Sequence, residues 1–224
     1  MPSVGAQVSN PSSVLEADGM PGWFGKLPGI GDFAYRRLPE VFRAAWDRWL
    51  QAGMARLRAR HADWTERYLK APLWFFVLGD GVIGHQSWLG VLMPSVDAVG
   101  RYFPLTVADE LVWAPTELHG QVLARAQQWW ALAAQAAFDG LEQDLDAVRF
   151  EARLLQLFSG EAVAGGGDSA SAMALPEFGQ SLWFTDPAGE AGPGMATHGL
   201  PQDEQFDALF GFAAGAPAQG TEAK

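Results

Sequence analysis

The sequence predicts an α/β protein of the α+β type, in which a mixed β-sheet of about five strands is flanked by helices in a single domain. Two observations predict this class. Strand-like apolar runs are concentrated before residue 110, long amphipathic segments follow them, and one strand-like run returns late in the chain. No internal repeat with a period of roughly 20 to 50 residues is visible, so a solenoid or propeller is not expected.

The clearest predicted strand covers residues 72–78, a continuous aromatic and aliphatic run between a proline and a Gly-Asp-Gly turn. Such a run is typical of a strand that is buried on both faces. Further strands are expected over 23–27, 87–93, 101–107 and 181–185. Pro104 cannot donate a hydrogen bond to a neighbouring strand, so we expect the strand at 101–107 to lie at a sheet edge or a bulge.

Proline and acidic residues mark the start of the first predicted helix. Pro39 suits the first helical position, and Glu40 follows it in the first turn. One face of this helix carries the apolar residues and a glycine, namely Phe42, Trp46, Trp49, Leu50, Gly53 and Leu57. Further helices are expected over 115–140, 141–158 and 202–210.

These elements place the domain boundaries. Residues 1–20 lack periodicity and predict a flexible N-terminal arm, residues 21–212 predict one domain, and residues 213–224 predict a disordered tail. A Gly-rich loop is expected over 160–173, within that domain.

Composition excludes several classes of protein. The 224 residues include no cysteine, which excludes disulfide scaffolds and thiolate metal sites. No apolar run approaches the ~18 residues that a membrane span needs, and the first 25 residues contain no Lys or Arg for the basic region of a secretory signal. We therefore expect a cytoplasmic protein without membrane insertion. A net charge of -11 argues against nucleic-acid binding.

The charge is distributed unevenly. Residues 26–70 contain ten of the fifteen Lys and Arg residues but only five Asp and Glu, whereas the rest of the chain carries five basic and twenty-one acidic residues. This basic block is either a solvated helix face with internal ion pairs or a surface that recognises an acidic or phosphorylated partner.

No residue pattern predicts catalysis. The four histidines are far apart and show no metal-ligand spacing, so we expect neither a metal nor a cofactor. Residues 29–34 formally match the dinucleotide pattern G-x-G-x-x-A. The predicted helix begins only at Pro39, however, whereas a pyrophosphate site needs a helix that starts directly at the glycines. A tight structural loop is the favoured interpretation.

Periodicity does not explain the stretches 22–39 and 93–106, where charged residues are crowded among glycine, proline and aromatic residues. We expect these loops to be held by buried or partly buried polar contacts. The residues expected to matter for their backbone geometry or packing, together with one tryptophan on the strand between them, are Gly25, Gly31, Trp74, Pro94, Gly100 and Pro104.

At these stretches the sequence resembles the TagF family, also called ImpM, which accompanies bacterial type VI secretion systems. The motifs that carry the resemblance are G-W-F-G-K-L-P at 22–28, G-D-F at 31–33, R-x-L-P at 36–39, W-D-x-W-L at 46–50, A-P-L-W at 71–74, W-L-G-V-L-M-P-S-V-D at 88–97 and G-R-Y-F-P-L-T at 100–106. The S-L-W-F run at 181–184 fits the family more loosely. Ala98 stands where the family pattern leads us to expect a basic residue.

The resemblance implies a non-enzymatic accessory protein that restrains type VI secretion after translation. It also implies a partner, the forkhead-associated scaffold protein of the secretion system. A purely structural component of the apparatus would instead co-purify stably with the assembled machine.

The charged residues of the two stretches allow two interpretations. Lys26, Arg36 and Arg37, with Arg43 and Arg48 nearby, could form a positive face that docks an acidic surface of the scaffold. Alternatively, Asp32 and Asp97 pair internally with Arg36 and Arg101 and lock the two loops. An enzyme or small-ligand binder that uses the loop from Gly29 to Asp32 together with Asp97 and Arg101 is the rival from another functional class.

Overall fold

The computed structural model describes residues 19–111, 117–160, 172–188 and 194–212. Its α+β class and single domain confirm the predicted class. A seven-stranded sheet with the order β2-β1-β5-β4-β3-β8-β9 forms the centre, and β6 and β7 form a separate two-stranded sheet. Most of the predicted N-terminal arm, most of the predicted 160–173 loop and the whole predicted tail lie outside the described residues.

The strands are β1 (Gly22–Gly25), β2 (Ala34–Arg36), β3 (Trp74–Ile83), β4 (Gln86–Met93), β5 (Leu105–Leu111), β6 (Glu117–His119), β7 (Ala172–Ala174), β8 (Gln180–Phe184) and β9 (Met195–His198). The helices are α1 (Glu40–Arg60), α2 (Trp64–Lys70), α3 (Gly120–Glu142), α4 (Ala147–Phe158) and α5 (Asp203–Leu209).

The sheet differs in two respects from the predicted mixed sheet of about five strands. All of its described strand pairs are antiparallel. β3 and β4 form a hairpin, and the loop after β4 returns β5 alongside β4. Two strands were not expected, β2 and β9, which are three and four residues long and lie at the two edges. Strands this short carry too few residues for an alternating pattern to be recognised.

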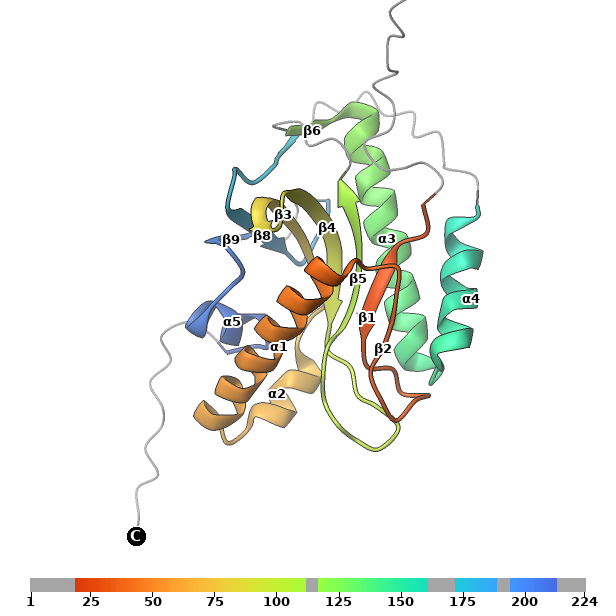
Figure 1. Ribbon diagram of the computed structural model, residues 1–224, viewed down its shortest axis with the longest axis vertical. Coiled ribbons are helices and arrows are strands. Elements are labelled where there is room, and N and C mark those ends of the chain that lie inside the picture. Colours follow the sequence, from red (N-terminus) through yellow and green to blue (C-terminus); the bar gives the residue numbers. More distant parts are fainter. Residues whose placement is uncertain (1–18, 112–116, 161–171, 189–193, 213–224) are drawn as a thin grey trace, which may run out of the picture.

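Helices cover both faces of the sheet (Figure 1). One face packs with α3 and α4, and the other packs with α1, α2 and α5. In β3, Phe75 and Val77 pack in the core on the side of α3 and α4, whereas Phe76 and Leu78 pack in the core on the side of α1, α2 and α5. The continuous apolar run at 72–78 is therefore buried on both faces, as predicted.

The prediction that Pro104 puts the strand at 101–107 at a sheet edge or a bulge is wrong. The strand begins only at Leu105, directly after Pro104, and β5 lies between β1 and β4 inside the sheet. Since Pro104 precedes the paired residues, its missing N–H costs the sheet no hydrogen bond.

The boundary between the third and fourth helices also differs from the prediction. The segment from Leu141 to Asp146 contains the end of α3 and a turn, in which Asp144 has a φ of 48°. Asp146 then caps α4 by accepting hydrogen bonds from the backbone N–H groups of Val148 and Arg149 at 2.9 Å. The predicted helix start at Pro115 lies outside the described residues.

The close contact between α1 and α5 can be tested by mutation. Gly53 of α1 packs against the ring of Phe206 in α5, and a Cβ at position 53 would overlap that ring. Phe206 cannot retreat, because it is buried against Trp49 and Phe210. We expect Gly53→Ala to lower the free energy of unfolding by about 2 kcal/mol through overpacking, despite the gain in helix propensity.

Chemical denaturation of the purified variant would measure this change. Gly31→Ala is the matched control, because no atom lies within 4 Å of a Cβ built at Gly31. A Gly53→Ala protein as stable as the Gly31→Ala protein would contradict the packing argument.

Candidate functional site

A buried ionic cluster joins the two motif-rich stretches. Lys26, directly after β1, forms an ion pair with Asp97 in the loop between β4 and β5, and both residues are almost fully buried. The same Asp97 oxygen accepts a hydrogen bond from Arg101 Nε at 2.7 Å. The other oxygen accepts backbone N–H groups, from Val99 at 3.1 Å and Arg101 at 2.8 Å. Both oxygens of the buried carboxylate are therefore satisfied.

The cluster determines the protonation of Asp97. Burial by itself would raise the pKa of this carboxyl group, because it penalises the charged form. Hydrogen bonds from Lys26 and from the backbone and side chain of Arg101 outweigh burial and hold the pKa well below its usual range. Asp97 is therefore ionised at neutral pH.

Further contacts extend from this cluster into both stretches. Arg101 Nη2 donates to the backbone oxygen of Gly31, and Ser95 Oγ donates to the backbone oxygen of Lys26 at 2.8 Å. The hydroxyl of buried Tyr68 in α2 donates to the Ser95 oxygen and accepts the Ser95 N–H. The predicted pairing of Asp97 with Arg101 is confirmed, and Lys26 is a second partner that the sequence argument did not assign to Asp97.

Two glycines of the motifs are required by backbone geometry. Gly25 has a φ of 139°, and a Cβ there would overlap the backbone oxygen of Pro104. Gly100 has a φ of 79° in the turn that brings Arg101 back to Asp97. Gly31, in contrast, has room for a side chain, so its contribution is the carbonyl oxygen that Arg101 binds.

The other motif residues have mainly structural surroundings. Pro94 is buried, and Trp74 donates from its indole nitrogen to the Leu209 oxygen of α5 at 2.9 Å. Ala98 is exposed and binds the Ile30 oxygen through its backbone N–H at 2.9 Å. The side chain at position 98 therefore faces solvent.

The glycine loop does not have the geometry of a nucleotide site. The N–H of Gly29 donates to the Leu145 oxygen at 3.1 Å, and a Cβ at Gly29 would overlap the backbone between Asp144 and Asp146. The next helix, α1, begins at Glu40 rather than at the glycines. The loop thus packs against the connection between α3 and α4, where a dinucleotide would need open space and a helix N-terminus.

Arg36 and Arg37 are neighbours in sequence but have different surroundings. Arg37 has a φ of 60° and forms an ion pair with Glu151 of α4, and it also donates to the backbone oxygens of Met20 and Pro21. Burial raises the pKa of Glu151, but hydrogen bonds from Arg37 and Trp23 lower it more. Arg37 therefore anchors the edge of the sheet to α4.

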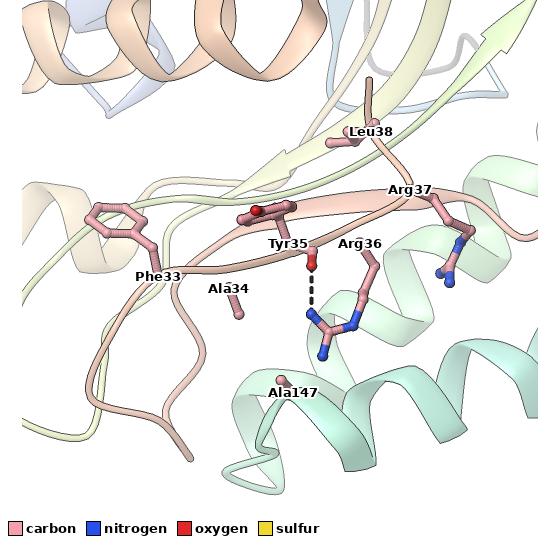
Figure 2. Close-up of a pocket in the computed structure, with 7 residues that line it drawn as sticks. All are labelled: Phe33, Ala34, Tyr35, Arg36, Arg37, Leu38 and Ala147. Carbon is pink, nitrogen blue, oxygen red and sulfur yellow. Dashed lines mark hydrogen bonds between the residues drawn. The ribbon is translucent and has the colours of Figure 1, made fainter. Parts of the chain in front are cut away.

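Arg36 is exposed and binds no carboxylate among the described residues. Its guanidinium donates to the Tyr35 backbone oxygen at 2.7 Å (Figure 2). It also lies 5.8 Å from the centre of the Trp23 ring. The predicted pair between Asp32 and Arg36 is wrong. Asp32 instead accepts the backbone N–H of Phe33 at 2.8 Å.

Most of the basic block is neutralised inside the domain. Seven of its ten cations form ion pairs with carboxylates, and these cations are Lys26, Arg37, Arg43, Arg56, Arg60, Arg67 and Lys70. Four of the seven bind carboxylates from outside the block, on the 97–101 loop, α4 and α5. Within the described residues, Arg36, Arg48 and Arg58 have no carboxylate partner. The exposed positive charge is therefore smaller than the sequence count suggested.

Exposed aromatic residues lie beside Arg36. Phe33 and Tyr35 are 41% and 48% exposed, and the guanidinium carbon of Arg43 lies 3.8 Å from the centre of the Tyr35 ring. A surface depression of about 500 Å³ is lined by residues 33–38 and by Ala147 at the start of α4 (Figure 2). Sequence reasoning missed Tyr35 and Glu151, because β2 is too short to be recognised and Glu151 is 114 residues from Arg37.

Within residues 19–111, 117–160, 172–188 and 194–212, no three His, Asp or Glu side chains are close enough together to hold a metal ion. None of the helices there combines the length and the apolar character needed to cross a membrane.

The comparisons with known proteins agree with this geometry. Residues 22–157 match the family described as TagF N-terminal domain, Type VI secretion system-associated. The chain belongs to the TagF family. Its fold is similar to the crystal structure of PA0076 from Pseudomonas aeruginosa PAO1, with a TM-score of 0.64 and 29% identity over 85% of this chain and 93% of that one. A search of curated proteins finds no significant relative.

Removal of one cation tests the role of the ionic cluster in this TagF domain. Lys26→Met leaves a buried carboxylate with one cation fewer, so we expect a loss of about 3 to 5 kcal/mol in the free energy of unfolding. Lys70→Met is the matched control, because its pair with Glu66 at 2.6 Å is exposed and should contribute less than about 1 kcal/mol. Equal stability of the two variants, measured by denaturant titration, would contradict a structural role for Lys26.

The depressed pKa of Asp97 predicts a pH dependence of TagF domain stability. The unfolded chain takes up the proton at a higher pH than the folded chain, so the stabilisation is complete at neutral pH and decreases as the pH falls below about 4. We expect the free energy of unfolding to decline less steeply with acid in Asp97→Asn than in the unmodified protein. Denaturant titrations between about pH 5 and pH 2.5 would measure both slopes, and identical slopes would exclude this contribution.

Proposed function

We propose that this chain is a cytoplasmic, non-enzymatic regulator that restrains a bacterial type VI secretion system after translation by binding the system's forkhead-associated scaffold protein. The observation that carries the proposal is the family match, which covers residues 22–157 and so includes the two motif-rich stretches and the exposed arginine at position 36.

The charges of the domain support docking through selected arginines. Lys26 is buried and Arg37 is bound to Glu151, so neither is available to a partner without disturbing the fold. Arg36 on β2 and Arg48 on α1 are exposed, and neither binds a carboxylate in the described part of the chain. Guanidinium groups recognise carboxylates and phosphates through paired hydrogen bonds, which suits an acidic surface on the scaffold.

The ligand-binding alternative has less support. It needs Gly29, Asp32, Asp97 and Arg101 to converge on a concave site with a strongly shifted acid. Asp97 does have a depressed pKa, but both its oxygens are bound by Lys26, Arg101 and backbone N–H groups. Asp32 is exposed and engaged with its neighbouring backbone. The depression beside β2 includes none of these four residues.

Charge reversal tests the proposal in cells that carry an active secretion system. We expect the unmodified chain to capture the scaffold protein and to lower secretion when overproduced. Arg36→Glu combined with Arg48→Glu should weaken capture by about tenfold or more, since arginines at interface centres commonly contribute this much, and should restore secretion.

Arg149→Glu is the control for charge, because Arg149 is an exposed arginine of α4 with no ion pair among the described contacts. Circular dichroism and thermal unfolding establish that all variants are folded. If the unmodified chain captures no scaffold and leaves secretion unchanged, the proposal is wrong. Stable co-purification with the assembled apparatus and no effect on secretion would favour a structural component instead.

A further inference from the structure

The edge strand β2 has an unpaired side. It pairs with β1 through Ala34, Tyr35 and Arg36, and no other described strand lies next to it. An exposed strand edge offers unpaired backbone groups that can pair with an extended segment of another chain. Residues 33–37 are exposed apart from half-buried Ala34. Three backbone groups along this stretch have local partners, namely the Phe33 N–H, the Tyr35 oxygen and the Arg36 oxygen.

Side chains of two kinds alternate along this edge. The Phe33 ring stacks on Phe24 with centres 5.9 Å apart and meets Phe103 edge-to-face at 4.7 Å. The Tyr35 ring lies under the Arg43 guanidinium of α1. These two rings face the core layer that contains α1. Ala34 packs with the opposite core layer, and Arg36 lies beside Trp23 of that layer. An added strand would therefore place alternate side chains beside the rings and beside Arg36.

The space beside the strand is open. The depression of about 500 Å³ lies along residues 33–38 and reaches Ala147, the first residue of α4 (Figure 2). An extended segment a few residues long fits along such a groove. A folded domain would instead have to contact the projecting rings from outside.

The positive charge of Arg36 favours a segment that carries an acidic side chain. Arg36 has no carboxylate partner among the described residues, and its guanidinium rests on the Tyr35 oxygen (Figure 2). Charged residues at sheet edges commonly discourage unspecific pairing. A carboxylate in an arriving segment would draw the guanidinium away and release the Tyr35 oxygen for other hydrogen bonds. A basic or uncharged segment would lack this attraction.

From these contacts we propose that β2 accepts an extended segment of the partner by strand addition, with apolar side chains beside Phe33 and Tyr35 and an acidic side chain opposite Arg36. This inference rests on the proposed function, because it names the surface and the kind of segment through which the scaffold binds.

Hydrogen exchange of the full chain, with and without the purified full-length scaffold protein, tests this mode of binding. Strand addition slows exchange of the β2 (Ala34–Arg36) amides that face away from β1 by about tenfold or more, because they become hydrogen-bonded and shielded from solvent. The Phe33 and Leu38 amides already have acceptors, the Asp32 side chain and the Arg36 oxygen. On the scaffold, one short segment with alternating apolar and acidic residues becomes protected at the same time.

Two single variants keep the test specific. Arg36→Glu and Tyr35→Ser should each weaken scaffold binding by about tenfold or more, whereas Arg149→Glu should leave it unchanged. Both altered side chains are exposed, so these variants are expected to fold.

The outcomes separate the two proposals. Protection of the outward-facing β2 amides together with weaker binding of both variants supports strand addition. If the scaffold binds but only other segments of this chain become protected, strand addition is overturned and the proposed function stands. The same holds if the protected part of the scaffold is a folded surface and not one short segment. If the scaffold does not bind the unmodified chain, both proposals fall.

Discussion

The pairing of buried Asp97 with Lys26 and Arg101 is the interaction on which the rest of this structure depends. Removal of Asp97 would leave buried Lys26 without a counter-charge, and removal of Lys26 would leave buried Asp97 with Arg101 alone. Either change costs more than the loss of an exposed ion pair. The pair connects the end of β1 to the loop between β4 and β5, across 71 residues of sequence. Because Arg101 also binds the Gly31 oxygen, the same cluster positions the loop that leads into β2. Gly25 then permits the close approach of Pro104 at this junction.

The charge asymmetry of the sequence has mainly a structural cause. Arg37 ties the edge of the sheet to Glu151 of α4, and Arg56 and Arg60 tie α1 to Asp203 and Asp207 of α5. The basic block therefore supplies cations that pair with acidic residues of α4 and α5. In the docking that we propose, only the cations without a carboxylate partner are available, so net charge is a poor guide to the binding surface and the pairing of individual arginines is a better one.

Continuous patterns allowed much of the fold to be predicted. The apolar run of β3 and the helical face from Phe42 to Leu57 were recognised, because burial repeats over several turns or residues. β2, α2 and the start of α4 were missed or misplaced. Each is short or is set by a single contact, such as the cap at Asp146. The internal pair of Asp97 with Arg101 was one of the two interpretations that the sequence allowed. The sequence cannot show that Lys26, 71 residues away, also binds Asp97, or that Asp32 binds the Phe33 N–H and not Arg36.

The position of the cluster gives the edge strand a property that composition could not reveal. Phe33 is exposed, yet it is held by Phe24 and Phe103, and Lys26 lies 4.8 Å from the centre of its ring. The loop before β2 is thus held both by the ionic cluster, through the Arg101 bond to the Gly31 oxygen, and by the aromatic contacts of Phe33. A surface that is ordered before binding loses less conformational entropy when a partner arrives. The buried charges and the exposed aromatic edge therefore act together: the first determines the backbone that the second presents.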